Sequence, residues 1–391
     1  MPAALYIDPE LLQYGTPRQR EYIEAINLHG SATAAAKHFN VNKNAVIEAV
    51  SLVKKKAALR GYSPDHNMRH TVPDGYRVKG VSTLYDREGK LRSQWVKSTE
   101  DRDRLQALLR EFVVWLARDA QAVYAPAPGP ATVNSEILAT YLFGDPHFGM
   151  RATAGEGGED FDTDEADRLT RAGIDRLADV TPDAEEALLI VIGDNTHAND
   201  SSARTPGHGN QLDMDAGGHN RSMLVSAKAW IYACQRLLAK HQRVKLWFMP
   251  GNHDPDAAYA LALTMFLYFE REPRINVDLD PSLYRYHLFG KVMIGAHHGH
   301  GSKPENLPLL MAVDRPADWG ASIVRYVYMG HIHHDSVKEV QGVRVESIRT
   351  LAAKDAWHAG QGYRSMRDTR SIVHHKDFGE IERHTCSAAM L

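Results

Sequence analysis

Cysteine is scarce in this sequence, with only Cys234 and Cys386 among 391 residues. Neither cysteine belongs to a C-x-x-C pair, which excludes a disulfide scaffold, a dithiol redox centre and a thiolate metal knot. Long hydrophobic runs are lacking as well. No stretch approaches the ~18 apolar residues needed to cross a bilayer, and the amino terminus lacks the charged and apolar regions of a signal peptide. We therefore expect a cytoplasmic protein that does not enter a membrane.

An excess of charge of one sign is also missing, since 46 basic and 49 acidic residues give a net charge of −3. The chain is therefore no polycation, and any contact with nucleic acid must come from a local patch. Its length exceeds the ~100 to 200 residues of an ordinary domain and predicts two or three of them. The clearest boundary is the Pro-rich segment 124–134, which is typical of an extended linker.

Residues 17–59 predict three short helices. A threonine cap followed by proline starts the first helix, which should end at Gly30, and a serine caps the second. After a turn at Asn40, Val46 lies on the apolar face of the third. The small residue Ala36 allows two helices to cross closely, and asparagine tolerates a left-handed backbone. This spacing resembles the helix-turn-helix modules of DNA-binding repressors and recombinases.

Basic residues concentrate in this region, with nine Lys/Arg against three acids between Lys37 and Lys79. A local excess of positive charge suits a phosphate backbone. We therefore expect residues 1–71 to form a nucleic-acid-binding module, with DNA as the favoured partner. The alternative is a solvated helical hairpin that packs on the domain that follows it. The residues expected to contact nucleic acid are Lys43, Asn44, Lys54, Lys55, Lys56 and Arg60.

Residues 72–123 predict a β-hairpin followed by a long helix. Polar and apolar residues alternate from Tyr76 to Val96 around a glycine-ended turn at 86–89. Apolar residues then recur at helical spacing from Glu100 to Val123. The apolar face of this helix needs a partner, which is either the domain after the linker or the same helix of a second copy in a homodimer.

Residues 135–391 predict an α/β domain, because short apolar runs typical of buried strands alternate with helical stretches. Five of these runs lead directly into motifs with metal-binding side chains. The motifs are Gly144–His147, Gly193–Asn195, Gly251–Asp254, His298–His300 and Gly330–His333. Loops at strand ends gather at one edge of an open α/β sheet, so the motifs should meet there. Carboxylate, carboxamide and imidazole groups without thiolate favour Mn²⁺, Fe or Zn²⁺ in a two-metal site that hydrolyses a phosphoester.

In their order along the chain, the five motifs resemble those of the calcineurin-like metallophosphoesterase superfamily. The resemblance implies a four-layer α/β/β/α sandwich, preceded here by the helical module, the hairpin and the long helix. It also implies two divalent ions, Mn²⁺ being favoured, with a metal-bridging hydroxide as nucleophile. By matched position, Asp145, His147 and His333 would hold one metal, Asn252, His298 and His331 the other, and Asp194 would bridge them.

The same resemblance implies roles for residues that are not metal ligands. His253 approaches the leaving-group oxygen in the family, as a general acid or transition-state stabiliser, and Asp254 could orient its ring. His197 stands where the nuclease subunit of double-strand-break repair complexes also has histidine, which helps orient the phosphate. The alternative for His197 is a surface histidine that is hydrogen-bonded to its loop.

Further polar residues lie near these motifs. His300 could contact a ligand, whereas packing or ordinary hydrogen bonding is the expected role of His297 and His334, because seven ligands already fill two sites. The glycine-rich segment Ser201–Arg221 is long for a connection and could cover the substrate. It would then offer Arg204 or His208 to a phosphate group, the alternative being a mobile surface loop.

The favoured function is that of a two-metal phosphodiesterase that acts as a DNA nuclease. The order of a helical module followed by a phosphoesterase domain resembles phosphoesterases of some bacteriophages. This resemblance implies that the protein would act in the cytoplasm of the host. One alternative is a phosphomonoesterase or small-nucleotide phosphodiesterase. Another is a DNA-binding regulator with a degenerate enzyme domain. Only 58 residues follow His333, fewer than the capping and ATPase-docking segments of the repair nucleases require, so no ATPase partner is expected.

Overall fold

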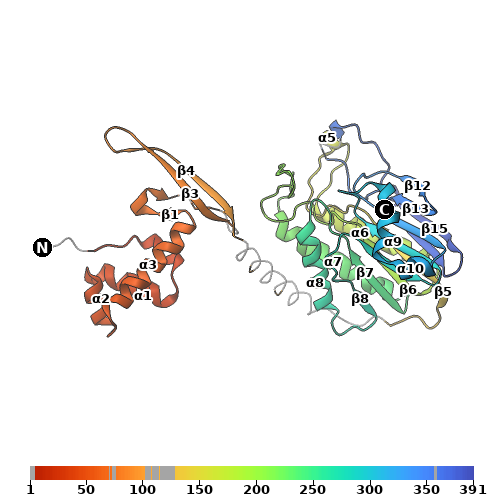
Figure 1. Ribbon diagram of the computed structural model, residues 1–391, viewed down its shortest axis with the longest axis horizontal. Helices are drawn as coiled ribbons and strands as arrows, with labels where there is room; N and C mark the ends of the chain where they lie inside the picture. Colours follow the sequence, from red (N-terminus) through yellow and green to blue (C-terminus); the bar gives the residue numbers. More distant parts are fainter. Residues whose placement is uncertain are drawn as a thin grey trace. The chain divides into compact units, whose positions relative to one another are not determined.

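The computed structural model describes residues 5–69, 71–72, 76–101, 107, 114, 128–355 and 359–391. The chain divides into two compact units, Met1–Phe112 and Val113–Leu391 (Figure 1). No helix in the described part of the chain combines the length and apolarity that crossing a bilayer requires.

The first unit is built on three helices, which lie where the sequence predicts them. They are α1 (Pro17–His29), α2 (Ala32–His38) and α3 (Lys43–Leu59), preceded by the 3₁₀ helix η1 (Pro9–Tyr14). A reciprocal capping box between Thr16 and Gln19 starts α1, and Gly30 ends it with a left-handed φ of 72°. Ile23, Ala35 and Val46 are completely buried in the shared core of the three helices. DNA binding by these helices stays a prediction.

A short two-stranded sheet and a long hairpin follow the helices. The elements are β1 (Tyr62–Ser63), η2 (Pro64–His66), β2 (Met68–Arg69), β3 (Tyr76–Tyr85) and β4 (Leu91–Glu100). β3 and β4 pair antiparallel, which confirms the predicted hairpin. The Asp86 carboxylate closes the turn by accepting from the amides of Glu88 and Lys90. Apart from Glu100, Asp101, Ala107 and Val114, the helix predicted to end at Val123 lies outside the described residues, as does the start of the linker.

The second unit contains two mixed sheets. One has the strand order β15-β14-β5-β6-β7-β8 and the other β12-β13-β11-β10-β9. The first sheet comprises β5 (Asn134–Phe143), β6 (Ala184–Val191), β7 (Arg243–Phe248), β8 (Ile275–Val277), β14 (Asp368–His375) and β15 (Gly379–Ser387). The second comprises β9 (Arg285–Phe289), β10 (Val292–His297), β11 (Val324–Met329), β12 (Ser336–Val340) and β13 (Val343–Ser347). Strands β5 to β8 are parallel to one another, and so are β10, β11 and β13.

The two sheets share one apolar core, and helices pack outside it. Leu142, Ile190 and Trp247 of the first sheet and Ile294 and Tyr328 of the second belong to a single buried cluster. The helices are α5 (Ala154–Gly157), α6 (Thr163–Val180), α7 (Gly218–Leu238), α8 (Pro255–Tyr268), η4 (Pro304–Asn306), α9 (Leu307–Asp314), α10 (Pro316–Ala321) and η5 (Ala388–Met390). α6, α7 and α8 pack against the first sheet and α9 against the second. The predicted α/β class is confirmed.

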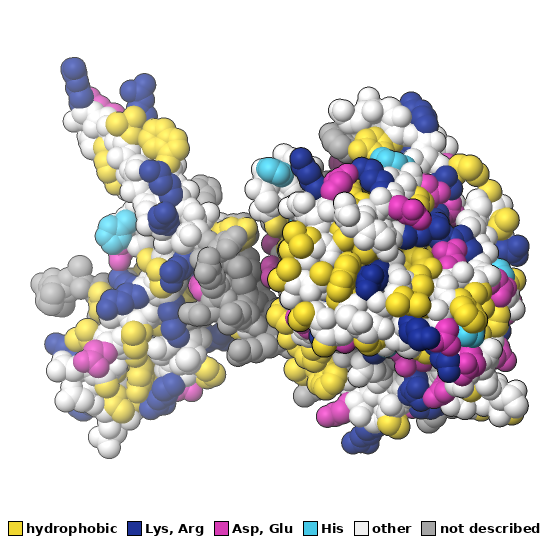
Figure 2. Space-filling model, turned by 45° about the vertical axis from the view of Figure 1, so that its right-hand side comes forward, with side chains coloured by type: hydrophobic (Ala, Val, Ile, Leu, Met, Phe, Trp, Pro, Cys, Tyr) yellow, Lys and Arg dark blue, Asp and Glu magenta, His cyan; other side chains and the backbone are white. Residues whose placement is uncertain are grey.

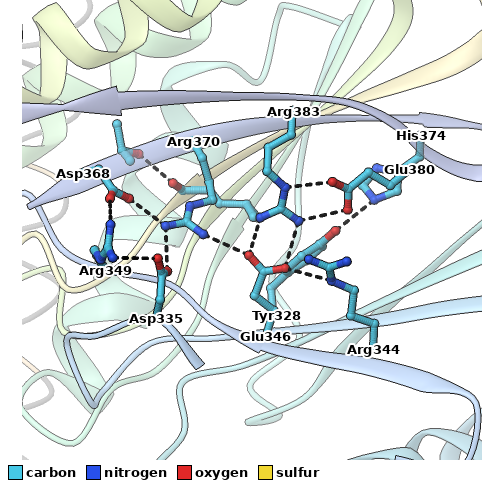
Figure 3. Close-up of polar contacts among 12 residues, drawn as sticks. Tyr328, Asp335, Arg344, Glu346, Arg349, Asp368, Arg370, His374, Glu380 and Arg383 are labelled. Atoms are coloured by element: carbon cyan, nitrogen blue, oxygen red, sulfur yellow. Dashed lines mark hydrogen bonds and ion pairs between the residues drawn. The ribbon is translucent and has the colours of Figure 1, made fainter. Parts of the chain in front are cut away.

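A buried ionic network also joins the sheets (Figure 3). Glu346 on β13 accepts hydrogen bonds from Arg370 on β14 at 2.9 Å and from Arg383 on β15 at 2.9 Å. Its side chain has no exposed surface. Burial alone would raise the pKa of Glu346, but the guanidinium groups of Arg383, Arg370 and Arg344 lower it. The carboxylate is therefore held in its charged form between the sheets.

Replacing Glu346 by alanine should destabilise the second unit strongly, because Arg370 and Arg383 would lose the buried carboxylate that they share. Among the described residues, Arg370 would keep only Asp335 and Asp368 as partners, and Arg383 only Glu380. We expect a loss of about 3 to 5 kcal/mol in the free energy of unfolding. Urea unfolding followed by the fluorescence of the buried Trp230 and Trp247 would measure it. As a control, Glu382→Ala removes a carboxylate whose side chain is 41% exposed, for which about 0 to 1 kcal/mol is expected. Equal losses of unfolding free energy in Glu346→Ala and Glu382→Ala would contradict the role of Glu346 between the sheets.

The stabilisation by Glu346 should depend on pH. Its pKa is lower in the folded chain than in the unfolded one, so its contribution is complete above the unfolded pKa and disappears as pH falls through the folded pKa. The difference in stability between wild type and Glu346→Ala should therefore shrink on acidification. A difference that grows on acidification would oppose this reading.

Candidate metal centre

The five predicted motifs meet at one edge of the second unit. Each lies on a loop that begins at the end of a strand, after β5, β6 and β7 in one sheet and after β10 and β11 in the other. Backbone hydrogen bonds connect neighbouring loops, from the His147 amide to the Asp194 carbonyl at 3.0 Å and from Gly330 to the His298 carbonyl at 2.8 Å. Parallel strands that end side by side thus bring together residues that are distant in sequence.

The first donor group consists of Asp145, His147 and His333. One ligand atom from each lies within 4.8 Å of the others. His333 Nε2 is 3.2 Å from Asp145 Oδ1, and the Nε2 atoms of His147 and His333 are 3.4 Å apart. Donor atoms from three side chains therefore face one small volume, as the ligands of a metal ion would. This is the set that the sequence assigned to one metal.

The second donor group contains Asp194, His298 and His331, again with ligand atoms within 4.8 Å. His298 Nε2 is 3.2 Å from Asp194 Oδ2 and 3.0 Å from the side-chain oxygen of Asn252. The opposite nitrogen of the His298 ring donates to the Ile192 carbonyl at 2.8 Å. A ring fixed in this way directs Nε2 toward the other donors, an arrangement typical of metal-binding histidines. The structure thus brings all seven predicted ligands together, while their assignment to particular ions stays a prediction.

The electrostatics of this edge favour bound positive charge. Asp145 is completely buried and Asp194 is 2% exposed. Burial lowers the pKa of His298, yet Asp194 and Asp145 outweigh burial and raise that pKa to about 10. For Asp194, burial acts in the opposite direction and raises the pKa of the carboxyl group. His298, His253 and His147 outweigh burial and hold this pKa well below its ordinary value. Buried carboxylates need cationic partners, and two divalent ions fit this set of oxygen and imidazole donors.

The loops that carry the ligands have strained backbones. Nine non-glycine residues in the described part of the chain have positive φ, and five of them are predicted ligands. These five are Asp145, His147, Asp194, His331 and His333, with φ between 46° and 69°. Each such conformation costs on the order of 1 to 3 kcal/mol and persists only where its surroundings hold it. The concentration of strain at this edge supports a functional role for the loops.

Glycines in the motifs allow the loops to approach closely. A Cβ atom at Gly251 would collide with the amide and carboxylate of Asp194, and one at Gly330 would lie 2.5 Å from Asp145 Oδ2. Any larger residue at either position would push a buried carboxylate away from its neighbours. Gly193 and Gly299 likewise lie close to the predicted ligands His298 and His331, whereas Gly144 packs against Ile348 and the Arg349 carbonyl.

The structure corrects the expected role of Asp254. Its carboxylate accepts from the amides of Thr196 at 3.0 Å and Gly251 at 3.1 Å, so it joins two ligand-bearing loops. The His253 ring is oriented by a different group, since its Nδ1 donates to the His197 carbonyl at 2.9 Å. Asp254 therefore does not orient the His253 ring, because its carboxylate is engaged by the two backbone amides. Burial, and then Asp194, raise the pKa of Asp254 to about 7.

His197 is part of the buried site. It is 2% exposed, and its Nδ1 lies 3.2 Å from Nδ1 of His147. Its ring also stacks on His253, with centroids 5.2 Å apart. The alternative of a surface histidine is therefore wrong. A third group of donor atoms within 4.8 Å joins His147, His197 and His253, next to the first predicted metal position.

Residues around the ligands have more ordinary roles. His297 is 1% exposed and stacks on Tyr284, and burial lowers its pKa to about 4, which agrees with packing. The ring of His300 is 5.2 Å from that of His298. Exposed His334 donates to the Ile332 carbonyl.

The predicted substrate loop is an exposed, internally bonded turn. Arg204 donates to the Gly209 carbonyl at 2.8 Å, and the Thr205 amide donates to the Asn210 carbonyl. Arg204 is therefore engaged within the loop itself. Neither Arg204 nor the exposed His208 belongs to a donor group. Their contact with substrate stays a prediction.

Sequence reasoning missed two supports of the site. Thr350 donates its hydroxyl to the Asp145 carbonyl at 2.6 Å, and Trp230 donates its indole N–H to the Asn195 side chain at 2.6 Å. Thr350 lies 205 residues after Asp145, and no local pattern links them. The sequence around Trp230 indicates only an apolar helical residue, and nothing in it predicts the hydrogen bond to Asn195.

The predicted nucleic-acid contacts divide into two classes. Lys43 and Asn44 are exposed at the start of α3, and Lys55 and Lys56 are exposed near its end. Lys54 is exposed too, but pairs with Asp65 at 2.7 Å. Arg60 donates to the Tyr76 carbonyl at 2.7 Å and so connects α3 to the hairpin.

No protein-family model and no curated protein matches the chain. Solved structures resemble it at low identity. An archaeal phosphodiesterase is 14% identical with a TM-score of 0.33, the match covering 64% of this chain and 99% of that one. The phosphoesterase Yfce of E. coli is 13% identical (TM-score 0.30; 63% and 98% covered). Zn²⁺-bound Vps29 of Entamoeba histolytica is 13% identical (TM-score 0.29; 64% and 99% covered). Likenesses this weak carry no conclusion about the chemistry of this chain.

Removing Asp194 should abolish tight metal binding, because its buried carboxylate belongs to the second donor group and is the expected bridge between the two ions. After chelation and reloading with Mn²⁺, elemental analysis should find about two ions per wild-type chain, the number of ions in a two-metal centre. For Asp194→Ala we expect a loss of affinity beyond the ~10- to 100-fold typical of residues that only support a ligand. Asp377→Ala, at the β14–β15 turn on the opposite edge of the sheet, is the control. Unchanged metal content in Asp194→Ala would reject the site.

Proposed function

We propose that this chain is a two-metal phosphodiesterase that cleaves DNA. The observation that carries the proposal is the convergence of seven side chains with oxygen or nitrogen donors from five loops. Two of the seven are the buried carboxylates of Asp145 and Asp194. When bound, two divalent ions would supply Lewis acidity and lower the pKa of water, the chemistry that phosphoester hydrolysis needs. A degenerate enzyme domain in a DNA-binding regulator would have no reason to keep this strained and costly arrangement.

The residues of the chain divide the remaining work. Asp145, His147 and His333 would hold one ion, and Asn252, His298 and His331 the other, with Asp194 shared. His253 is fixed by two hydrogen bonds, from its amide to Asp194 at 2.8 Å and from Nδ1 to the His197 carbonyl. Its Nε2 is then the atom that can hold a proton for the leaving oxygen. Asp254 keeps the Thr196 and Gly251 loops together.

The choice of DNA as substrate is supported by the first unit. Its third helix presents exposed Lys43, Lys55 and Lys56, and lysines that approach phosphates give affinity without base specificity. A phosphomonoesterase or small-nucleotide phosphodiesterase would not need such a surface. The substrate class therefore depends on this unit, and the reaction type depends on the metal centre.

His253→Ala should lower the rate of hydrolysis without removing the metals. General acid–base catalysis contributes about 10²- to 10⁴-fold, so we expect a decrease of this size in kcat for bis-p-nitrophenyl phosphate with Mn²⁺. Metal content, measured on the same preparation, should match wild type. His334→Ala replaces a nearby exposed histidine and should be neutral. A fully active His253→Ala would refute the role of this residue.

A chain that begins at Ala131 should separate chemistry from substrate capture. It should keep wild-type turnover of bis-p-nitrophenyl phosphate and lose ~10-fold or more of its activity on DNA, since tethered binding raises effective concentration. The panel includes single-stranded and duplex DNA, p-nitrophenyl phosphate and cyclic nucleotides. Turnover confined to monoesters or cyclic nucleotides would favour the alternative enzyme. Equal loss on the small diester and on DNA would contradict this division of labour.

A further inference from the structure

The β3–β4 hairpin has two faces of different character. Side chains alternate across a strand, so pairs two positions apart share a face. Gly80 pairs with Lys97, Ser82 with Trp95, and Leu84 with Ser93. We call these six residues the Trp95 face. The intervening pairs, such as Thr83 with Gln94, form the opposite face.

The opposite face is attached to the rest of the first unit. Gln94 donates to the His66 carbonyl at 3.3 Å and to the Thr83 hydroxyl at 3.1 Å. Asn67 donates to the Tyr85 hydroxyl at 3.4 Å. These bonds fix which side of the hairpin is turned toward η2 and β2. The Trp95 face is the side turned away from them.

The Trp95 face is open in the described structure. Trp95 is 57% exposed and Leu84 47%. A Cβ atom built at Gly80 would meet no heavy atom within 4 Å, so the surface beside Lys97 is uncovered. Single exposed apolar residues are ordinary on proteins. Trp95, however, lies on a two-stranded ribbon that has no core of its own against which the indole could pack.

The strands of the hairpin are also positively charged. Between Arg77 and Thr99, excluding the turn 86–90, the strands carry four basic residues and no acid. These are Arg77, Lys79, Arg92 and Lys97. None of the four has an ion-pair partner among the described residues, whereas arginines of the second unit such as Arg370 and Arg383 are paired with carboxylates. Figure 2 shows dark-blue Lys and Arg side chains along the hairpin with hydrophobic side chains between them.

We propose that the Trp95 face binds single-stranded nucleic acid, with a base stacked on Trp95 and a phosphate contacted by Lys97. Aromatic side chains on a positively charged surface are the usual means of holding single strands. In a duplex, both faces of a base are covered by its neighbours, so an indole can stack only on a base that has left the helix. The inference rests on the proposed nuclease function and adds the strand form of its substrate.

Binding of the full chain to a fluorescently labelled oligo-dT, measured by anisotropy in EDTA, tests the face without hydrolysis. The oligonucleotide should be about 20 nucleotides long, which exceeds the ~4 to 16 nucleotides of common single-strand modules. Trp95→Ala should weaken binding about tenfold, as loss of one stacked base does. Lys97→Ala should reduce the slope of log affinity against log salt by about 0.7, the value for one phosphate contact on a single strand.

A third variant tests the face without changing Trp95 or Lys97. Gly80→Glu places a carboxylate opposite Lys97 in open space and should also weaken binding. The controls come from the β14–β15 turn of the second unit, where Phe378 is 73% exposed and Lys376 pairs with Glu136. Phe378→Ala and Lys376→Ala should bind the oligonucleotide as wild type does.

Wild-type affinity in Trp95→Ala and Gly80→Glu would overturn the inference, as would a wild-type chain that binds only duplex DNA. Hydrolysis of bis-p-nitrophenyl phosphate with Mn²⁺ is measured on the same proteins. Weak binding combined with wild-type hydrolysis in the three hairpin variants supports the inference. Absent hydrolysis in the wild type would reject the proposed function, and the anisotropy result would still decide for or against the Trp95 face.

Discussion

The burial of two carboxylates, Asp145 and Asp194, is the constraint on which the rest of the site depends. Uncompensated negative charge in a low-dielectric interior is unstable, so the surrounding groups must supply or attract positive charge. Asp194 and Asp145 accordingly raise the pKa of His298 and so favour the cationic form of its ring. The left-handed ligand residues, the glycines that permit close approach and the imidazoles around the carboxylates all follow from placing these two side chains together.

Ligands come from both sheets, so the packing of one sheet on the other sets the distances between donors. The apolar core aligns the strand ends, and the ionic network adds a directional contact between the sheets. Arg370 connects the two roles, since it contacts Glu346 between the sheets and Asp335, which lies two residues after His333. The same side chain thus helps hold the sheets and the loop that carries two predicted ligands.

The first unit differs from the second in the size of its core and in the pairing of its charges. Its core is small, and its helices depend on caps and on a few completely buried residues such as Ile23 and Val53. Between Lys37 and Lys79 it carries nine basic residues against three acids, whereas many basic side chains of the second unit belong to ion pairs. The basic unit would thus serve the proposed binding of a polyanion, and the unit with paired charges would serve the proposed hydrolysis.

The sequence by itself determined the helix ends, the hairpin and the loops that carry the ligands, because caps, turn residues and strand-end motifs are local signals. Capping at Thr16 and the glycine at residue 30 are examples. Only the tertiary structure decided which groups orient the side chains of the candidate site. His253 is held by a backbone carbonyl 56 residues away, Asp254 joins two loops, and Thr350 supports Asp145 from 205 residues away. Such contacts depend on how strands pack and where side chains point, and neither composition nor spacing along the chain encodes that direction.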